Sequence, residues 1–297
     1  MPNPQRFFPE EPFSERSASA LPRSLQLGGF PINYRAQVIR LLTGTLDIRC
    51  QLTNELIEQR SNYSKIVFFT NTRLSTKTLS SSLAPITLNR LGKHLLKNQA
   101  KHLNLYKELF HEFSNYFYES KMQQPTKAFL HLYRIIEFSA YSYPIVWASK
   151  TNDYEGTFRK LREYFSDPKR GELGVFRMFI SDFMDTTFLN SHLTLNISSV
   201  HPDWQIRYYE SILKAINHIK GNAVSLTPYS QITIEAEIML DLAITIRNKY
   251  FHFLSGDKSN FDSENIPDSN EFFMLINEPL ANWLAIILFE LIEYEIL

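Results

Sequence analysis

Three residues in the last fifth of the chain, Arg247, Asn248 and His252, have side chains that could act together on a phosphate. An imidazole with an unperturbed pKa of about 6.5 can take or give a proton near neutral pH. A guanidinium keeps its charge and offers a planar fork of donors to the oxygens of a phosphorane. Asn248 could orient the phosphate or the imidazole without adding charge. The alternative is a structural Arg–His pair, held where a cation meets the C-terminal dipole of a helix.

The spacing of these residues limits what a single helix can do with them. Asn248 and His252 are four residues apart and share a helix face. Arg247 and His252 are five apart, which is about 140° around an ideal helix. One helix alone therefore presents this arginine and this histidine poorly to one phosphate.

The segment Ile246-Arg247-Asn248-Lys249-Tyr250-Phe251-His252 resembles the R-x4-6-H motif of the HEPN superfamily, in the form Arg-Asn followed by an aromatic residue and His. A second segment, Leu132 to Tyr141 with Glu137 in it, resembles the first long helix of such domains. The resemblance covers roughly residues 125–297, and the residues before it resemble no family. Toxins of this superfamily that pair with a nucleotidyltransferase carry a Tyr two residues after the His. Leu254 stands there, which disfavours that subclass.

The resemblance implies a prokaryotic endoribonuclease that acts in antiphage defence or in a toxin-like stress response. The ribose 2′-OH would attack its own 3′ phosphate without a metal or cofactor, leaving a 2′,3′-cyclic phosphate and a 5′-OH. Arg247 and His252 would be catalytic, Asn248 would support them, and Glu137 would hold the arginine or polarise the histidine. The resemblance also implies a homodimer whose two motifs line one cleft. It is also compatible with a regulatory or defence-system partner protein. The alternative is a non-catalytic HEPN-like dimerisation or scaffold protein that docks a partner or nucleic acid.

The zero formal net charge hides two oppositely charged parts. Residues 1–125 hold 16 Lys and Arg and 9 Asp and Glu, or +7, and residues 126–297 hold 15 and 22, or −7. No acid lies between Gln59 and Lys107. In this stretch Lys93, Lys97 and Lys101 are four residues apart, and Arg90 precedes them. The spacing predicts one basic helix ridge that could follow an RNA backbone. The alternative is a solvated face that docks on the acidic part of the chain.

Metal chemistry has weaker support in the sequence. Glu108, His111 and Glu112 are helix neighbours that would need a third ligand. Other acids could serve a two-metal nuclease, a third possible function: Asp182, Asp185, Glu235, Glu237 and Asp241. We expect no metal and no cofactor.

The elements that must position these residues are mostly helical, because Gly plus Pro is only 9 + 14 = 23 of 297 residues. Apolar periodicity predicts helices over eight segments: 34–60, 89–117, 127–143, 154–165, 173–188, 204–219, 232–254 and 280–297. A short β-branched and aromatic run predicts one strand at 65–69. We therefore expect a mainly α protein. Six prolines in residues 1–31 predict an extended or flexible arm. Residues 32–122 are expected to form a basic α or α+β region, and residues 123–297 an all-α HEPN-like domain.

Three features of the sequence indicate the cellular compartment in which we expect the protein. Cys50 has no partner for an intrachain disulfide, and the first residues contain no apolar signal region. The apolar run Leu280–Phe289 is shorter than the roughly 20 residues of a membrane span. We expect a cytoplasmic protein without a membrane segment.

Overall fold

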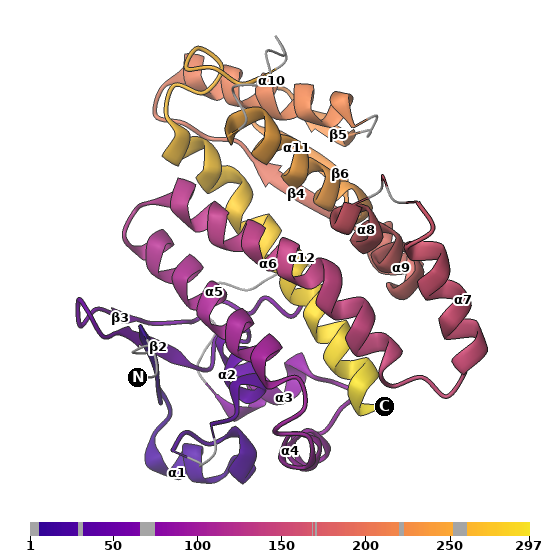
Figure 1. Cartoon of the computed structure of the whole chain (residues 1–297). Coiled ribbons are helices and arrows are strands. Elements are labelled where there is room, and N and C mark those ends of the chain that lie inside the picture. Colours follow the sequence, from indigo (N-terminus) through magenta and orange to yellow (C-terminus); the bar gives the residue numbers. More distant parts are fainter. Residues whose placement is uncertain are drawn as a thin grey trace.

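The computed structural model describes residues 6–28, 32–65, 75–167, 169, 171–219, 223–251 and 260–297. Helices dominate these residues, with one small antiparallel sheet among the N-terminal elements and another beside the C-terminal helices (Figure 1). The prediction of a mainly α fold is therefore confirmed.

Three long helices form the centre of the molecule: α5 (Leu103–Lys121), α6 (Pro125–Ala148) and α12 (Ser269–Ile296). Helix α6 packs against both α5 and α12. Helix α12 continues past Pro279 and is apolar on nearly every side, as expected of a helix enclosed by others. It is long and apolar enough to cross a membrane, but 83% of its most apolar window is buried inside the protein.

Three side chains of α12 donate to backbone carbonyl groups of the segments that surround it. The Asn277 amide donates to the carbonyl of Pro125 (2.9 Å), and the indole of Trp283 donates to that of Ala236 (2.8 Å). The Asn282 amide donates to the carbonyls of Tyr63 and Lys65. Because each pairing satisfies a buried polar group, α12 fixes loops from three distant parts of the chain.

The N-terminal residues are more ordered than the proline content predicts. Residues 6–28 contain β1 (Phe7–Glu10), α1 (Glu15–Ser19) and a 3₁₀ turn, η1 (Arg23–Leu25), instead of an extended arm. Strand β1 pairs with β2 (Asp47–Cys50), which pairs with β3 (Leu56–Ile57). Phe7 is buried on this sheet, so its burial offsets the entropy that the arm loses.

The helix predicted over residues 34–60 is shorter than expected. Helix α2 covers only Tyr34–Leu42, and the chain turns at Gly44, whose φ is +69°. A Cβ atom at this position would lie 2.8 Å from the carbonyl oxygen of Ser61. The turn therefore needs glycine, and it directs the following residues into β2.

The helix predicted over residues 89–117 is broken into two. After α3 (Thr76–Ser82), helix α4 covers Leu88–Lys97, and α5 starts only after His102, whose φ is +58°. The Arg35 guanidinium donates to the carbonyl of Lys101 and so holds the turn between the helices. Lys101 consequently does not continue the helical ridge of Lys93 and Lys97. The predicted strand at 65–69 falls, apart from Lys65, outside the described residues.

The C-terminal part contains strands that the all-α prediction missed. Helices α7 (Tyr154–Tyr164), α8 (Gly171–Phe183) and α9 (Thr186–Leu189) lead into β4 (His192–Asn196), and α10 (Pro202–His218) follows. Strand β6 (Gln231–Glu235) lies between β4 and β5 (Ala223–Thr227). The helix predicted over 232–254 therefore begins later: a 3₁₀ turn, η2 (Ala236–Ile238), precedes α11 (Met239–Phe251).

The predicted boundary near residue 122 does not separate two cores. It falls in the turn between α5 and α6, and these helices pack side by side. A single cluster of buried apolar residues includes β1, α2, the three long helices and the strands of both sheets. The basic N-terminal region and the helical C-terminal region therefore stabilise each other.

Candidate functional site

An aromatic cluster fixes the end of α11, the helix that carries the candidate motif. Phe251 stacks on Phe129 of α6 and on Phe273 of α12, with ring centroids 6.4 and 5.9 Å apart. Tyr250 contacts Phe273 edge-on at 5.0 Å. Because rings of three helices interlock here, the last turn of α11 has a defined place in the bundle.

Arg247, one turn before the aromatic cluster, lies on the surface of α6. Its guanidinium carbon is 5.0 Å from the centroid of the Tyr133 ring, a cation–π contact. Its Nη1 also donates to Oδ1 of Asn248 at 3.1 Å. Arg247 is partly exposed and Asn248 is exposed. The guanidinium is thus held by two neighbours, and part of Arg247 is exposed.

Glu137 lies one helical turn after Tyr133 on α6, so the charges of both Glu137 and Arg247 act on the Tyr133 hydroxyl. Burial raises the pKa of the Tyr133 hydroxyl; the positive charge of Arg247 opposes this shift, and the negative charge of Glu137 adds to it. The structure thus brings Arg247, Asn248 and Glu137 to one region of the α6–α11 surface. Sequence reasoning missed Tyr133, although its position four residues before Glu137 was a usable signal. His252 directly follows α11 and lies outside the described residues.

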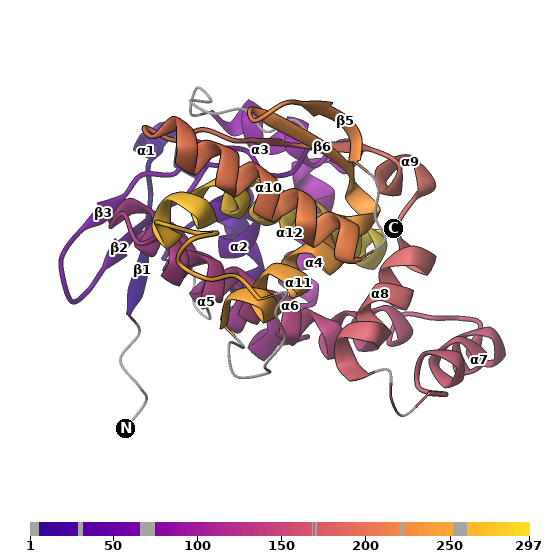
Figure 2. The ribbon, with the colours of Figure 1, turned by 90° about the horizontal axis from the view of Figure 1, so that it is seen from above.

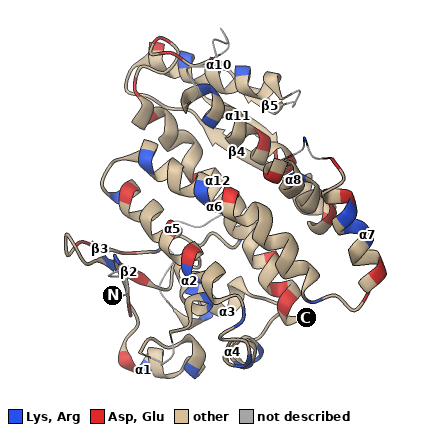
Figure 3. Ribbon diagram, in the orientation of Figure 1, with Lys and Arg blue, Asp and Glu red and all other residues tan. Residues whose placement is uncertain are grey.

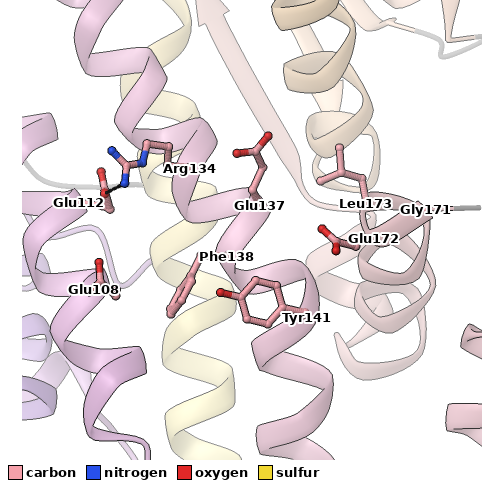
Figure 4. A pocket seen from close by; sticks show the side chains of 9 residues that line it. All are labelled: Glu108, Glu112, Arg134, Glu137, Phe138, Tyr141, Gly171, Glu172 and Leu173. Carbon is pink, nitrogen blue, oxygen red and sulfur yellow. Dashed lines mark ion pairs between the residues drawn. The ribbon is translucent and has the colours of Figure 1, made fainter.

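Glu137 also lines a pocket of about 780 Å³ between α5, α6 and the start of α8 (Figure 4). Phe138 and Tyr141 supply aromatic surface, with their ring centroids 5.3 Å apart. The pocket is mostly acidic in charge, because four carboxylates and a single guanidinium line it: Glu108, Glu112, Glu137, Glu172 and Arg134.

The guanidinium in this pocket is already paired. Arg134 Nη2 lies 3.0 Å from Oε1 of Glu112, and His131 Nδ1 lies 2.7 Å from its other oxygen. Glu112 is buried and uses both oxygens in these contacts, so it has little capacity left for a metal. The remaining carboxylates would repel phosphates, and the pocket suits a cation better than RNA.

The residues predicted to bind RNA lie elsewhere, at and just after α4 (Figure 3). Lys93, Lys97 and Lys101 are exposed, and among the described residues none of these ammonium groups forms an ion pair. Arg90 has another role: its Nη2 donates to the carbonyl of Ile296 at 3.1 Å. The basic segment therefore docks on the end of α12 through Arg90 and leaves three lysines to solvent.

This arrangement separates the lysines from Arg247. Helix α4 lies at the Ile296 end of α12, whereas the last turn of α11 contacts Phe273 near the other end. The 23 residues between these two positions span roughly 35 Å at 1.5 Å per residue. Figure 1 shows α4 and α11 at opposite ends of the molecule. The structure thus does not bring the lysines and Arg247 into one local site.

His94 links α4 to a buried cluster of charges at the same end of α12. Its Nε2 lies 2.8 Å from Nη1 of Arg35, which also pairs with Glu295 at 3.3 Å. The guanidinium can only donate, so the imidazole must accept and stay neutral. Burial, with the charge of Arg35 next, lowers the pKa of His94 to about 4.

This low pKa predicts a loss of stability in acid. The unfolded chain binds more protons between pH 6.5 and 4, because an unfolded histidine titrates at about 6.5. The His94 contribution is therefore complete above pH 6.5 and is lost as the pH falls toward 4. We expect His94→Gln, which keeps an acceptor for Arg35 but cannot titrate, to lose less unfolding free energy than wild type between pH 7 and 5. Urea titrations at both pH values measure this, and equal losses would contradict it.

Among the described residues, no group of three or more His, Cys, Asp or Glu is arranged to hold a metal ion. Two of the acids considered for metal binding are occupied by neighbours. Asp182 pairs with Lys160 and accepts from the Tyr164 hydroxyl, and Asp241 pairs with Arg177. Asp185 caps α9 by accepting from the backbone of Thr187.

Comparison of the chain with protein-family models, with curated proteins and with solved structures found no match in any of the three.

Proposed function

We propose that this protein is a metal-independent, cytoplasmic endoribonuclease of the HEPN type that serves antiphage defence or a toxin-like stress response. Arg247 stabilises the phosphorane, His252 transfers protons, and Asn248 orients the phosphate or the imidazole. RNA is the substrate, no cofactor takes part, and two copies pair their α11 helices to complete one cleft.

One observation carries this proposal: contacts with Tyr133 and Asn248 hold Arg247, a partly exposed residue, one turn before the end of α11. The Tyr133 ring supports its guanidinium at 5.0 Å, and the Asn248 amide is 3.1 Å away. Phe251, the residue immediately before His252, is held by its ring contacts with Phe129 and Phe273. Preorganised donors contribute most to catalysis where charge develops, and an arginine held in this way meets that requirement.

The acidic pocket beside Glu137 favours a second candidate function, a non-catalytic HEPN-like scaffold. Its carboxylates and aromatic rings would suit a basic segment of a partner protein and would disfavour nucleic acid. In this case Arg247 and Asn248 would form part of a docking surface.

Metal removal and mass measurement separate these functions. We expect the purified full chain to cleave at least one class among transfer, ribosomal and messenger RNA at the same rate with and without EDTA. Loss of cleavage in EDTA would favour a metal-dependent nuclease. A chain that forms dimers but cleaves none of these RNAs would favour the scaffold.

A further inference from the structure

Helix α7 carries a row of apolar side chains that its own chain leaves largely uncovered. Tyr154, Phe158 and Phe165 are 80, 66 and 63% exposed, and Leu161 is partly buried against the core. We call these four residues the α7 stripe. Their spacings of four, three and four residues form the a and d positions of a heptad, the pattern of a coiled-coil seam. An exposed apolar row of this kind typically marks an interaction surface.

An adjacent side of α7 holds the helix on the molecule. Tyr164 is buried and its hydroxyl donates to Oδ2 of Asp182 on α8 at 3.1 Å. Lys160 Nζ lies 2.8 Å from the same oxygen. Helix α7 stands at the outer edge of the molecule in two perpendicular views (Figures 1 and 2). Tyr154, Phe158 and Phe165 therefore face solvent, and Leu161 lies at the border between these residues and the attached side of α7.

The stripe is complementary to itself when two copies of α7 run antiparallel. In an antiparallel seam each a residue faces a d residue. Phe158 of one copy would then face Leu161 of the other, and Tyr154 would face Phe165. Each contact occurs twice, as an isologous two-fold interface requires.

The charges beside the stripe fit the same pairing. Glu155 and Arg162 occupy the two e positions, and e positions face each other in an antiparallel pair. Both side chains are exposed, and neither forms an ion pair within the described part of the chain. Pairing would place Glu155 of each copy against Arg162 of the other, so the charges and the apolar side chains specify one common register.

We propose that the α7 stripe binds the α7 stripe of a second copy of this chain in an antiparallel, two-fold contact. This contact is separate from the pairing of α11 helices and does not depend on the proposed function. If both contacts form, the assembly exceeds a dimer, as a closed tetramer or an open filament. If only the α7 contact forms, the assembly is a dimer.

Charge reversal with rescue tests this proposal on the full chain. Glu155→Arg and Arg162→Glu each turn two symmetry-related attractions into repulsions, so each should raise the dissociation constant about tenfold. The double variant exchanges the charges and should return to within about threefold of wild type. Sedimentation velocity over a concentration series measures the constant, and circular dichroism checks that each variant is folded.

Two further variants sharpen the test. Phe158→Ser, in the middle of the stripe, should at least halve the mass of the assembly at a concentration where wild type is associated. Arg159→Glu changes an exposed neighbour that faces away from the seam, and it should leave the mass unchanged. The proposal is overturned if wild type stays monomeric up to about 100 µM, if either charge reversal leaves association unaltered, or if the double variant remains as weak as the single ones.

Discussion

Replacing Arg247 with alanine is expected to slow RNA cleavage by about 10²- to 10³-fold, the effect of removing one preorganised donor from a developing oxyanion. The Tyr133 ring and the Asn248 amide hold the guanidinium in place, so alanine removes a donor that is already positioned. His252→Ala should cost a similar or larger factor, because general acid–base transfer contributes 10²- to 10⁴-fold. Single-turnover cleavage of a labelled RNA measures both.

Matched variants separate this effect from general damage. Arg16→Ala and His218→Ala change exposed side chains outside the motif, and both should cleave at the wild-type rate. Arg247→Lys keeps the charge but loses the planar fork, so its rate should fall between those of wild type and Arg247→Ala. Full cleavage by both Arg247→Ala and His252→Ala would refute the catalytic assignment.

Glu295→Ala is expected to destabilise the fold by about 3–5 kcal/mol, the cost of breaking a buried ion pair by removing one partner. The Glu295 carboxylate pairs with Arg35 at 3.3 Å and accepts from the Tyr106 hydroxyl at 2.8 Å. The side chains of Arg35 and Glu295 are only 4% and 2% exposed. Alanine would leave a buried guanidinium without its carboxylate, and urea denaturation followed by circular dichroism would report the loss.

The same helix provides the control for this prediction. Glu293 lies two residues earlier and is partly exposed, and its carboxylate forms no ion pair or hydrogen bond among the described residues. Glu293→Ala should therefore change the unfolding free energy by less than about 0.5 kcal/mol. The double variant Arg35→Met, Glu295→Leu removes both charges and should recover much of the stability. Equal effects of the two single glutamate variants would show that the buried pair contributes nothing.

The helices that the sequence predicted best are those whose own periodicity decides their structure. Residues 154–165 and 204–219 were expected to be helical, and α7 and α10 match them within two residues. Residues 232–254 misled the prediction, because Ile232 and Ile234 fit both a helical row and a strand. Pairing with β4, which is distant in sequence, makes these residues part of the strand β6.

Contacts with distant residues also explain the broken basic helix. The Asn98 amide donates to the carbonyl of His94 at the end of α4, and the bond from Arg35 to the Lys101 carbonyl holds the turn that follows. The predicted lysine ridge assumed an unbroken helix and is therefore wrong at Lys101. The separation of these lysines from Arg247 along α12 depends on tertiary packing and could not be read from the spacing of charges.

Part of the candidate site was predictable, and part was not. The spacing of Arg247 and Asn248 placed both on the last turns of one helix, and α11 has them there. The sequence predicted that Glu137, on the helix that became α6, lies near Arg247, but it did not identify the contact of Tyr133 with Arg247, which joins residues 114 positions apart. The acidic pocket likewise gathers carboxylates from α5, α6 and α8.

The chemical ends of the RNA products test the central claim most directly. Wild-type protein incubated with RNA in EDTA should yield 2′,3′-cyclic phosphate and 5′-OH ends, because an attack by the 2′-OH needs only the proton transfers and charge stabilisation that His252 and Arg247 supply. Mass spectrometry of the fragments distinguishes these ends from others. Fragments with 3′-OH and 5′-phosphate ends, or cleavage only when a divalent metal is present, would contradict the account.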